Sequence, residues 1–206
     1  MCGIAGAFSF SSSLLASTAK VKSMTDAIAH RGPDGEGVWE SVNGKVVLGH
    51  RRLAIIDLSD LSKQPMMDAS GKFVIVFNGE IYNFCELKED LINQGVSFFS
   101  HSDTEVLLSL YIKYGEDCLS MLDGMFAFAI YDVEKNKLFC GRDRFGEKPF
   151  YYVVRDGLLV FGSEIKSIKA YFADLEIDFS KVQSYIDGSL KFGDLDTPFK
   201  EVKTLN

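Results

Sequence analysis

The sequence is short of side chains that bind transition metals. Its 206 residues include four cysteines and three histidines. No two of Cys2, Cys85, Cys118 and Cys140 stand close enough to form a C-x-x-C pair, which excludes the common zinc-binding motifs. We therefore expect no metal site. Scattered, unpaired cysteines are typical of a reducing compartment, so the sequence predicts a cytoplasmic protein.

The sequence also lacks a basic stretch, a long apolar run and a recognisable signal peptide. The formal net charge is −7 and the pI is about 5.0, and an acidic surface repels nucleic-acid phosphates. No apolar segment approaches the roughly 20 residues of a membrane-spanning helix. The segment FSFSSSLLA has no basic region before it and is too short for a secretory signal. We expect neither a nucleic-acid nor a membrane partner.

The sequence does contain enough apolar residues for one folded domain. Hydrophobic residues make up 47% and aromatic residues 13% of the chain. Strand and helix patterns occur in separate groups, which predicts an α+β fold with antiparallel layers. The expected strands are 2–10, 38–41, 45–56, 73–77, 125–131, 137–142, 150–154 and 158–162. The expected helices are 19–30, 87–93 and one that follows His101.

Two boundaries carry further expectations. Ser102, with Glu105 three residues later, matches a capping box at the start of a helix. The segment 178–206 predicts a short helix and a linker that ends abruptly at KTLN. We therefore expect residues 1–177 to form the domain, and residues 178–206 to lead to a further domain outside this chain.

Cys2 stands directly behind the initiator methionine, in MCGIAGAFSF. A lone cysteine is most often a small buried residue on a strand. If Met1 is removed, however, Cys2 carries both a thiol and a free α-amine. The ordinary pKa of such an amine is about 7.7–8.0 and that of the thiol about 8.5, so the amine can act as the base for the thiol. A retained Met1 would turn this amine into an unreactive amide.

The stretch FNGEIYN, residues 77–83, has two interpretations. Asn-Gly after an apolar strand is a strong hairpin signal. A hairpin needs a returning strand, yet the sequence after Asn83 soon becomes helical in pattern. The alternative is a sharp bend that points the Gly79 N–H and the Asn78 amide into a cleft. Two such donors could hold a developing oxyanion.

Charged residues supply a second set of candidates. Alternation along HRRLAIID sends Arg51 and Arg52 to opposite faces of a strand, so one of them could bind a carboxylate in bidentate fashion. Asp103 and Glu80 could each bind an ammonium group, although Asp103 also suits a helix N-terminus without any ligand. A carboxylate site beside an ammonium site indicates recognition of a free α-amino acid. The nucleophile suggests attack on its side-chain amide.

Nine motifs in order resemble one family. They are MCGIAGAF, HRGPDG, HRRLAIIDLS, QPM, NGEIYN, SDTEV, GMFAFAIYD, DRFGEKPFYY and FGSEIKSI. Together they resemble the N-terminal glutaminase domain of glutamine-dependent asparagine synthetase, which is a class II glutamine amidotransferase domain. The resemblance covers nearly the whole chain. It implies a four-layer αββα sandwich of the N-terminal-nucleophile hydrolase type.

The resemblance also implies roles for individual residues. Cys2 matches the catalytic nucleophile, and Asn78 and Gly79 match the oxyanion hole. The substrate-binding positions are matched by Arg52, Leu53, Ile56, Glu80 and Asp103. Of these, Arg52 matches the position that binds the substrate carboxylate, and Glu80 and Asp103 match positions that hold its α-amino group. Arg31 resembles a loop arginine near the nucleophile, and DRFGEKP is expected to have a structural or interdomain role.

The implied reaction is hydrolysis of L-glutamine to L-glutamate and ammonia through a thioester on Cys2. No cofactor is expected in this domain. ATP and Mg²⁺ are expected only in the absent synthetase domain, because no SGG-x-DS type pyrophosphate loop occurs in the 206 residues. That domain, which would amidate aspartate with the ammonia, is the expected partner, and a homodimer is left open.

Two alternatives remain at this point. The glutaminase could serve another acceptor, such as a sugar or a different carboxylate. If Met1 is retained, the domain could bind glutamine or a protein partner without turnover.

Overall fold

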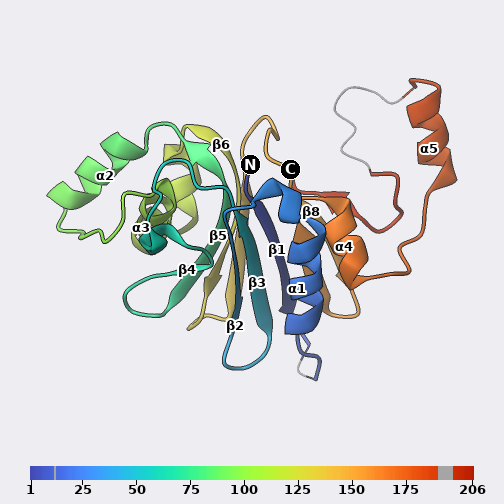
Figure 1. The fold of residues 1–206 in the computed structure, drawn as a ribbon, viewed down its shortest axis with the longest axis horizontal. Coiled ribbons are helices and arrows are strands. Elements are labelled where there is room, and N and C mark those ends of the chain that lie inside the picture. The colour runs from blue at the N-terminus through green and yellow to red at the C-terminus, as the bar shows by residue number, and fades with distance from the viewer. Residues whose placement is uncertain (12, 190–196) are drawn as a thin grey trace.

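The computed structural model describes residues 1–11, 13–189 and 197–206. Two antiparallel sheets pack face to face, and helices cover the outer face of each sheet (Figure 1). The layers therefore follow the order helix, sheet, sheet, helix. This arrangement confirms the predicted α+β sandwich with four layers.

The first sheet has six strands in the order β10-β8-β9-β1-β3-β2. Its strands are β1 (Gly3–Ser9), β2 (Gly35–Glu40), β3 (Val46–Arg52), β8 (Tyr151–Arg155), β9 (Leu158–Gly162) and β10 (Lys203–Thr204). The second sheet has the order β4-β5-β6-β7. Its strands are β4 (Met66–Met67), β5 (Phe73–Ile81), β6 (Gly124–Asp132) and β7 (Lys137–Arg142). The predicted bounds of β7 and β9 are confirmed.

The helices form the two outer layers. The first sheet is covered by α1 (Thr18–Ala27) and α4 (Ile165–Tyr171), and the second by α2 (Phe84–Asn93) and α3 (Asp103–Tyr114). Single 3-10 segments occur at Ala29–Arg31, Asp60–Ser62 and Gly115–Met121. None of the helices in the described ranges has the length and apolar content needed to cross a membrane.

β1 lies at the centre of the molecule and is buried along its whole length. Alternate residues explain this burial. Ile4 and Phe8 face the second sheet, whereas Ala5 and Ala7 face α1 and α4. Small residues on that outer face let the helix layer approach closely. The residue before β1 is Cys2, so the fold places it at the start of a fully buried central strand.

The structure corrects both interpretations of Asn78–Gly79. β5 continues straight through these residues and pairs with β6 as far as Ile81 opposite Gly124. There is neither a hairpin turn nor a bend at this point. The strand predicted for residues 45–56 was too long, because β3 ends at Arg52 and a loop follows.

The start of α3 is only partly as predicted. Ser102 Oγ accepts a hydrogen bond from Thr104 N at 3.0 Å, which confirms Ser102 as the N-cap. The capping box is wrong, since the Glu105 carboxylate accepts hydrogen bonds from Ser100 N at 2.7 Å and Phe99 N at 2.9 Å instead. Glu105 thus anchors the preceding loop and not the N-cap residue itself.

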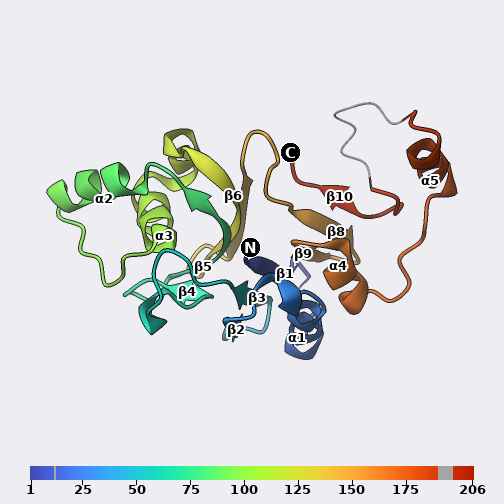
Figure 2. The ribbon, with the colours of Figure 1, turned by 45° about the horizontal axis from the view of Figure 1, so that its top comes forward.

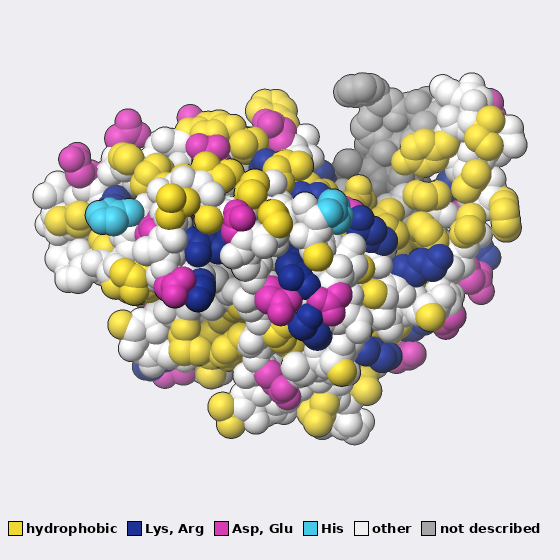
Figure 3. All heavy atoms as spheres, viewed as in Figure 1, with side chains coloured by type: hydrophobic (Ala, Val, Ile, Leu, Met, Phe, Trp, Pro, Cys, Tyr) yellow, Lys and Arg dark blue, Asp and Glu magenta, His cyan; other side chains and the backbone are white. Residues whose placement is uncertain are grey.

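The C-terminal segment departs from a simple linker. Residues 178–189 contain the predicted short helix, α5 (Phe179–Ile186), which stands apart from the layers in Figure 2. Apolar side chains gather on α5, where Phe179 and Ile186 are 77% and 74% exposed (Figure 3). Residues 190–196 of the expected linker lie outside the described residues. The chain then returns to the first sheet, where β10 pairs with β8.

Candidate active site

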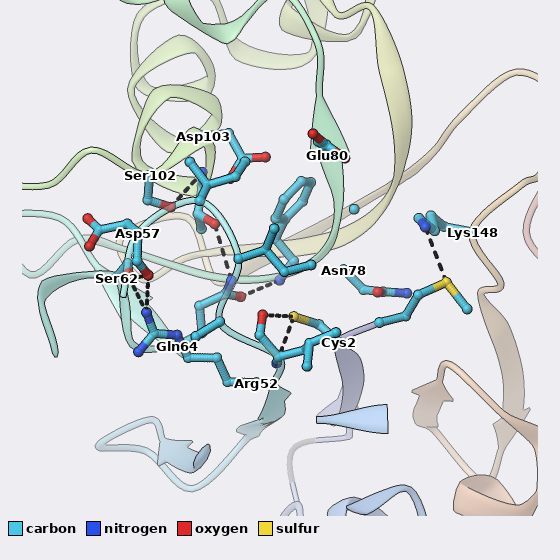
Figure 4. A pocket seen from close by; sticks show the side chains of 18 of the residues that line it. Cys2, Arg52, Asp57, Ser62, Gln64, Asn78, Glu80, Ser102, Asp103 and Lys148 are labelled. Atoms are coloured by element: carbon cyan, nitrogen blue, oxygen red, sulfur yellow. Dashed lines mark hydrogen bonds between the residues drawn. The ribbon is translucent and has the colours of Figure 1, made fainter. Parts of the chain in front are cut away.

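A cavity of about 140 Å³ opens between the starts of β1 and α3. Its lining brings together all the predicted catalytic and substrate-binding residues, which are Cys2, Arg52, Leu53, Ile56, Asn78, Gly79, Glu80 and Asp103. Figure 4 labels five of them around the cavity, namely Cys2, Arg52, Asn78, Glu80 and Asp103, which come from both sheets and from α3. Segments that are far apart in the sequence therefore converge at this cavity.

The Cys2 thiol lies against the loop that follows β3. Its Sγ is 3.3 Å from Leu53 N and 3.5 Å from Leu53 O. Burial raises the pKa of this thiol above its ordinary value, and the hydrogen bond from Leu53 N opposes the rise. The neutral thiol is thus the favoured form, and it needs a nearby base to become a nucleophile.

Arg31 holds the backbone of the nucleophile and does not line this cavity. Its Nε donates to the Cys2 carbonyl at 2.9 Å, and its Nη1 pairs with Glu164 at 3.0 Å. The side chain of Arg31 is only 9% exposed. Arg31 is therefore close to Cys2, as predicted, but its contact is with the main chain.

Met1 occupies the other side of Cys2. Its Sδ lies 3.3 Å from the Nζ of Lys148, and both residues line the cavity. Lys148 is 5% exposed and belongs to the DRFGEKP motif. While Met1 is attached, the nitrogen of Cys2 is an amide and cannot accept a proton from the thiol.

One edge of β5 loses its strand partner beside the cavity. β4 pairs with β5 only at Val74 and Ile75. Beyond this point, Phe77 N donates to Gln64 Oε1 at 2.6 Å, and Ile81 N donates to Asp103 Oδ2 at 3.2 Å. Backbone groups two residues apart point to the same edge of a strand.

Gly79 lies between these two positions on the open edge. Among the hydrogen bonds of the described residues, its N–H has no partner. A Cβ at this position would come within 2.3 Å of Met125 O, so only glycine fits against β6. The strand therefore offers a free N–H donor to the cavity without any bend.

The side chain of Asn78 points from β5 toward the sheet that carries Cys2. Asn78 is 1% exposed, and its Nδ2 is buried without a hydrogen-bond partner among the described residues. Leaving a buried donor unpaired costs about 1–3 kcal/mol. An unpaired amide beside the free Gly79 N–H forms a pair of donors ready for an anionic oxygen.

Arg52 is shared between a loop and the cavity. Its Nη2 donates to the carbonyls of Asp57 and Ser59 and to Ser62 Oγ, and the Ser59 contact is 3.0 Å. Nε and Nη1 have no protein acceptor among the described residues, so either of them can donate to a ligand carboxylate. Arg51 points the opposite way and pairs with Asp26 and Glu36, as alternation predicts.

The two acidic residues differ in burial. Asp103 is 5% exposed, and burial raises the pKa of its carboxyl to about 6, with the charge of Glu80 adding to the rise. Glu80 is exposed at the rim. A ligand ammonium beside Asp103 would favour the ionised form of its carboxyl.

Several residues at the site escaped the sequence-based prediction. Gln64, Ser102, Thr104, Met125 and Lys148 also line the cavity. Gln64 belongs to the motif QPM and Lys148 to DRFGEKP. Membership of these motifs was the feature of the sequence that could have identified both as site residues. In the described part of the chain, no group of three or more His, Cys, Asp or Glu side chains is placed to hold a metal ion.

Comparisons with known proteins agree with this geometry. A family model described as the glutamine amidotransferase domain matches residues 1–206. The glutamine-hydrolyzing asparagine synthetase 3 of Bacillus subtilis (strain 168) is 43% identical over 173 residues, or 83% of this chain. Amidase chry2 of Gibberella zeae is 42% identical over 152 residues, or 74% of this chain. Among solved structures, a glutamine phosphoribosylpyrophosphate amidotransferase from B. subtilis aligns with a TM-score of 0.70 at 24% identity, covering 82% of this chain and 43% of that one.

The chain is much shorter than the curated relatives it matches. It spans 28% of the B. subtilis synthetase and 22% of the Gibberella amidase. The solved structure supports the fold, and the family model covers the chain from end to end. The chain belongs to the glutamine amidotransferase domain family, as the resemblance of its nine motifs predicts.

Proposed function

We propose that this domain hydrolyses L-glutamine to L-glutamate and ammonia, with Cys2 as the nucleophile after removal of Met1. The observation that carries the proposal is the pair of unused donors, Asn78 Nδ2 and Gly79 N–H, on the strand that faces Cys2 across the cavity. Neither donor has a hydrogen-bond partner among the described residues. The pair suits the oxygen of a carboxamide that becomes negative during attack.

Substrate recognition follows from the charges around the cavity. An open N–H of Arg52 donates to the α-carboxylate of glutamine in a charge-assisted hydrogen bond, and Asp103 and Glu80 bind its ammonium group. With both charged groups on the α-carbon held, the side-chain amide extends toward Cys2. Leu53 and Ile56 line the path between these points.

The reaction proceeds through a thioester. The Cys2 α-amine takes the proton of the thiol, and the thiolate attacks the amide carbon of glutamine. Asn78 and Gly79 hold the resulting oxyanion. The Cys2 ammonium then protonates the departing nitrogen, and ammonia leaves. The same amine removes a proton from water, which attacks the thioester, releases glutamate and restores the thiol.

In the longer protein, ammonia passes to a synthetase domain that amidates aspartate with ATP and Mg²⁺. The asparagine synthetase name of several relatives supports this acceptor. The amidase name of the Gibberella relative keeps a different acceptor as the second candidate. We propose no cofactor for the glutaminase domain itself. The boundary at residue 177, the cytoplasmic location and a homodimer remain predictions.

The test begins with the intact mass of the purified protein, followed by an ammonia-release assay with glutamine. We expect a chain that begins at Cys2 and turns over. Cys2→Ala should bind glutamine with unchanged affinity and release no ammonia. A glutamine-like diazo-ketone should label Cys2 and spare the exposed Cys85, which serves as the control thiol.

The rival function is a glutamine-binding module without catalysis. A correctly processed Cys2 terminus with no ammonia release, even when the rest of the protein is present, would select that rival. Full activity in Cys2→Ala would remove Cys2 from the mechanism.

A further inference from the structure

His50 is buried between the two sheets and has no role in the reaction proposed above. It lies on β3 opposite Ile4 of β1, so its backbone belongs to the sheet that carries Cys2. Its side chain crosses to the second sheet, where Nε2 lies 3.1 Å from the carbonyl oxygen of Phe77. A carbonyl only accepts, so Nε2 carries the proton and donates.

The Phe77 carbonyl belongs to the peptide unit that joins Phe77 to Asn78. A hydrogen bond to this oxygen therefore fixes the plane from which the Asn78 side chain departs. Gln64 holds the same residue from its other polar group, because Gln64 Oε1 accepts from Phe77 N at 2.6 Å (Figure 4). Both polar groups of Phe77 are thus held by side chains at the point where β4 has ended.

Gln64 also connects the backbone of Phe77 to helix α3. Its Nε2 lies 3.2 Å from Thr104 Oγ1 on α3, next to Asp103. The contacts of His50 and Gln64 therefore tie the nucleophile's sheet and the ammonium-binding helix to the backbone of one residue of β5, Phe77. Phe77 lies immediately before Asn78 and Gly79, the two oxyanion donors.

The cost of His50 argues against a purely structural role. The side chain is 1% exposed, and its Nδ1 is buried without a partner among the described residues. Burial holds the pKa of the imidazole at about 4, so the ring stays neutral near pH 7. An apolar side chain of similar size would avoid the unpaired nitrogen. Stability alone therefore does not explain a histidine here.

We infer that His50 and Gln64 are positioning residues that clamp the backbone N–H and C=O of Phe77 and so set the distance between Cys2 and the oxyanion donors. The inference rests on the proposed glutaminase function. Displacements of about 1 Å at a reacting centre can cost roughly 100-fold in rate. Neither His50 nor Gln64 forms a hydrogen bond with Arg52 among the described residues, so we expect the clamp to affect the transition state more than binding of the substrate carboxylate.

The test compares His50→Leu with Leu48→Ala. Leu48 lies two residues earlier on the same strand and faces the same core between the sheets, so it controls for lost packing. His50→Leu should lower kcat roughly 10- to 100-fold and change the KM for glutamine less than about threefold. It should weaken binding of glutamate γ-semialdehyde, which forms an oxyanion-like adduct with Cys2, by the same factor as kcat. Leu48→Ala should lower the melting temperature without this loss of kcat.

A second pair of variants covers the case in which His50→Leu does not fold. His50→Gln places an amide donor near the position of Nε2 and should restore most of kcat. His50→Asn is polar but too short to reach Phe77, so it should resemble the leucine variant. Gln64→Leu should also lower kcat and weaken binding of the semialdehyde.

A double-mutant cycle separates the clamp from a general effect on the fold. In an Asn78→Ala background, His50→Leu should cost less than about threefold in kcat, because the donor that it positions is already gone. Equal factors in both backgrounds, or an equal loss of kcat in Leu48→Ala, would overturn the inference. Absence of turnover in the wild-type protein would instead end the proposed function.

Discussion

At the scale of single residues, the buried carboxylate of Asp103 is expected to bind the substrate ammonium but to lower the stability of the fold. Its carboxyl has a pKa of about 6 in the folded protein, compared with 3.8 ordinarily, because the side chain is buried. Between about pH 4 and pH 6 the folded state therefore binds a proton that the unfolded chain has released. The free energy of unfolding falls as the pH rises through this window, and the loss at neutral pH is at most about 3 kcal/mol.

Asp103→Asn should remove this dependence. We expect the variant to be more stable than the wild type at pH 7, because it buries no charge, and to bind glutamine at least about tenfold more weakly. Urea unfolding between pH 3.5 and pH 7.5 measures the first effect. Calorimetric titration of glutamine into the Cys2→Ala protein, with and without Asp103→Asn, measures the second.

The pH dependence supplies the control for this prediction. Below about pH 4 both proteins carry a neutral side chain at position 103, so their stabilities should converge. In the Cys2→Ala protein, glutamine should bind more tightly as the pH rises through about 6, when Asp103 becomes ionised. Parallel stability curves at all pH values would contradict the assignment of the raised pKa to Asp103.

At the scale of elements, sequence patterns predicted strand bounds correctly where neighbouring residues alone determine the conformation. The bounds of β7 and β9 could be predicted because tight turns precede or join these strands. Asn136, Asp156 and Gly157 have positive φ values of 49°, 52° and 78°, which short polar residues and glycine tolerate. These turns need no information from distant parts of the chain.

The turn preferences of neighbouring residues gave a wrong prediction at β5, because residues distant in the sequence determine its conformation. Asn78–Gly79 has the strongest local signal for a turn, yet pairing with β6, more than 40 residues away, keeps it extended. The residue identities of the candidate site could be predicted from the motifs. The clamp by His50 and Gln64 could not, because it depends on where β4 ends.

The loop after β3 gives a prediction at this scale. The Nη2 of Arg52 holds three oxygens of residues 57–62, while Nε and Nη1 remain for a ligand. Lysine cannot do both, because it lacks the planar fork. Arg52→Lys should therefore raise the KM for glutamine about tenfold or more, leave kcat within about threefold, and speed proteolysis within residues 53–62.

Arg51→Lys is the matched control for Arg52→Lys. Arg51 is the neighbouring arginine, and it pairs with Asp26 and Glu36 on the outer face of the sheet. The KM for glutamine should not change in this variant. An equal rise in KM for both variants would show that strand stability, and not the guanidinium of Arg52, determines substrate affinity.

At the scale of the whole molecule, the end of the chain belongs to the fold that precedes it. β10 pairs with β8, Val202 is 3% exposed, and Leu205 N donates to Phe150 O at 2.9 Å. Arg142 donates to the carbonyls of Leu205, at 2.9 Å, and of Lys148, at 2.7 Å. The last ten residues therefore support the loop that carries Lys148 to the cavity.

A chain shortened after residue 177 should consequently be less stable than the full chain. Val202→Asp tests the same contact with a single change, because it places a charge in an apolar site that contributes roughly 1.5–3 kcal/mol. Both should lower the melting temperature by several degrees, as followed by circular dichroism. Phe179→Ser is the control, since Phe179 is 77% exposed on α5 and should leave the melting temperature nearly unchanged. A shortened chain that melts at the same temperature as the full one would support residue 177 as the end of the domain and show that β10 is dispensable.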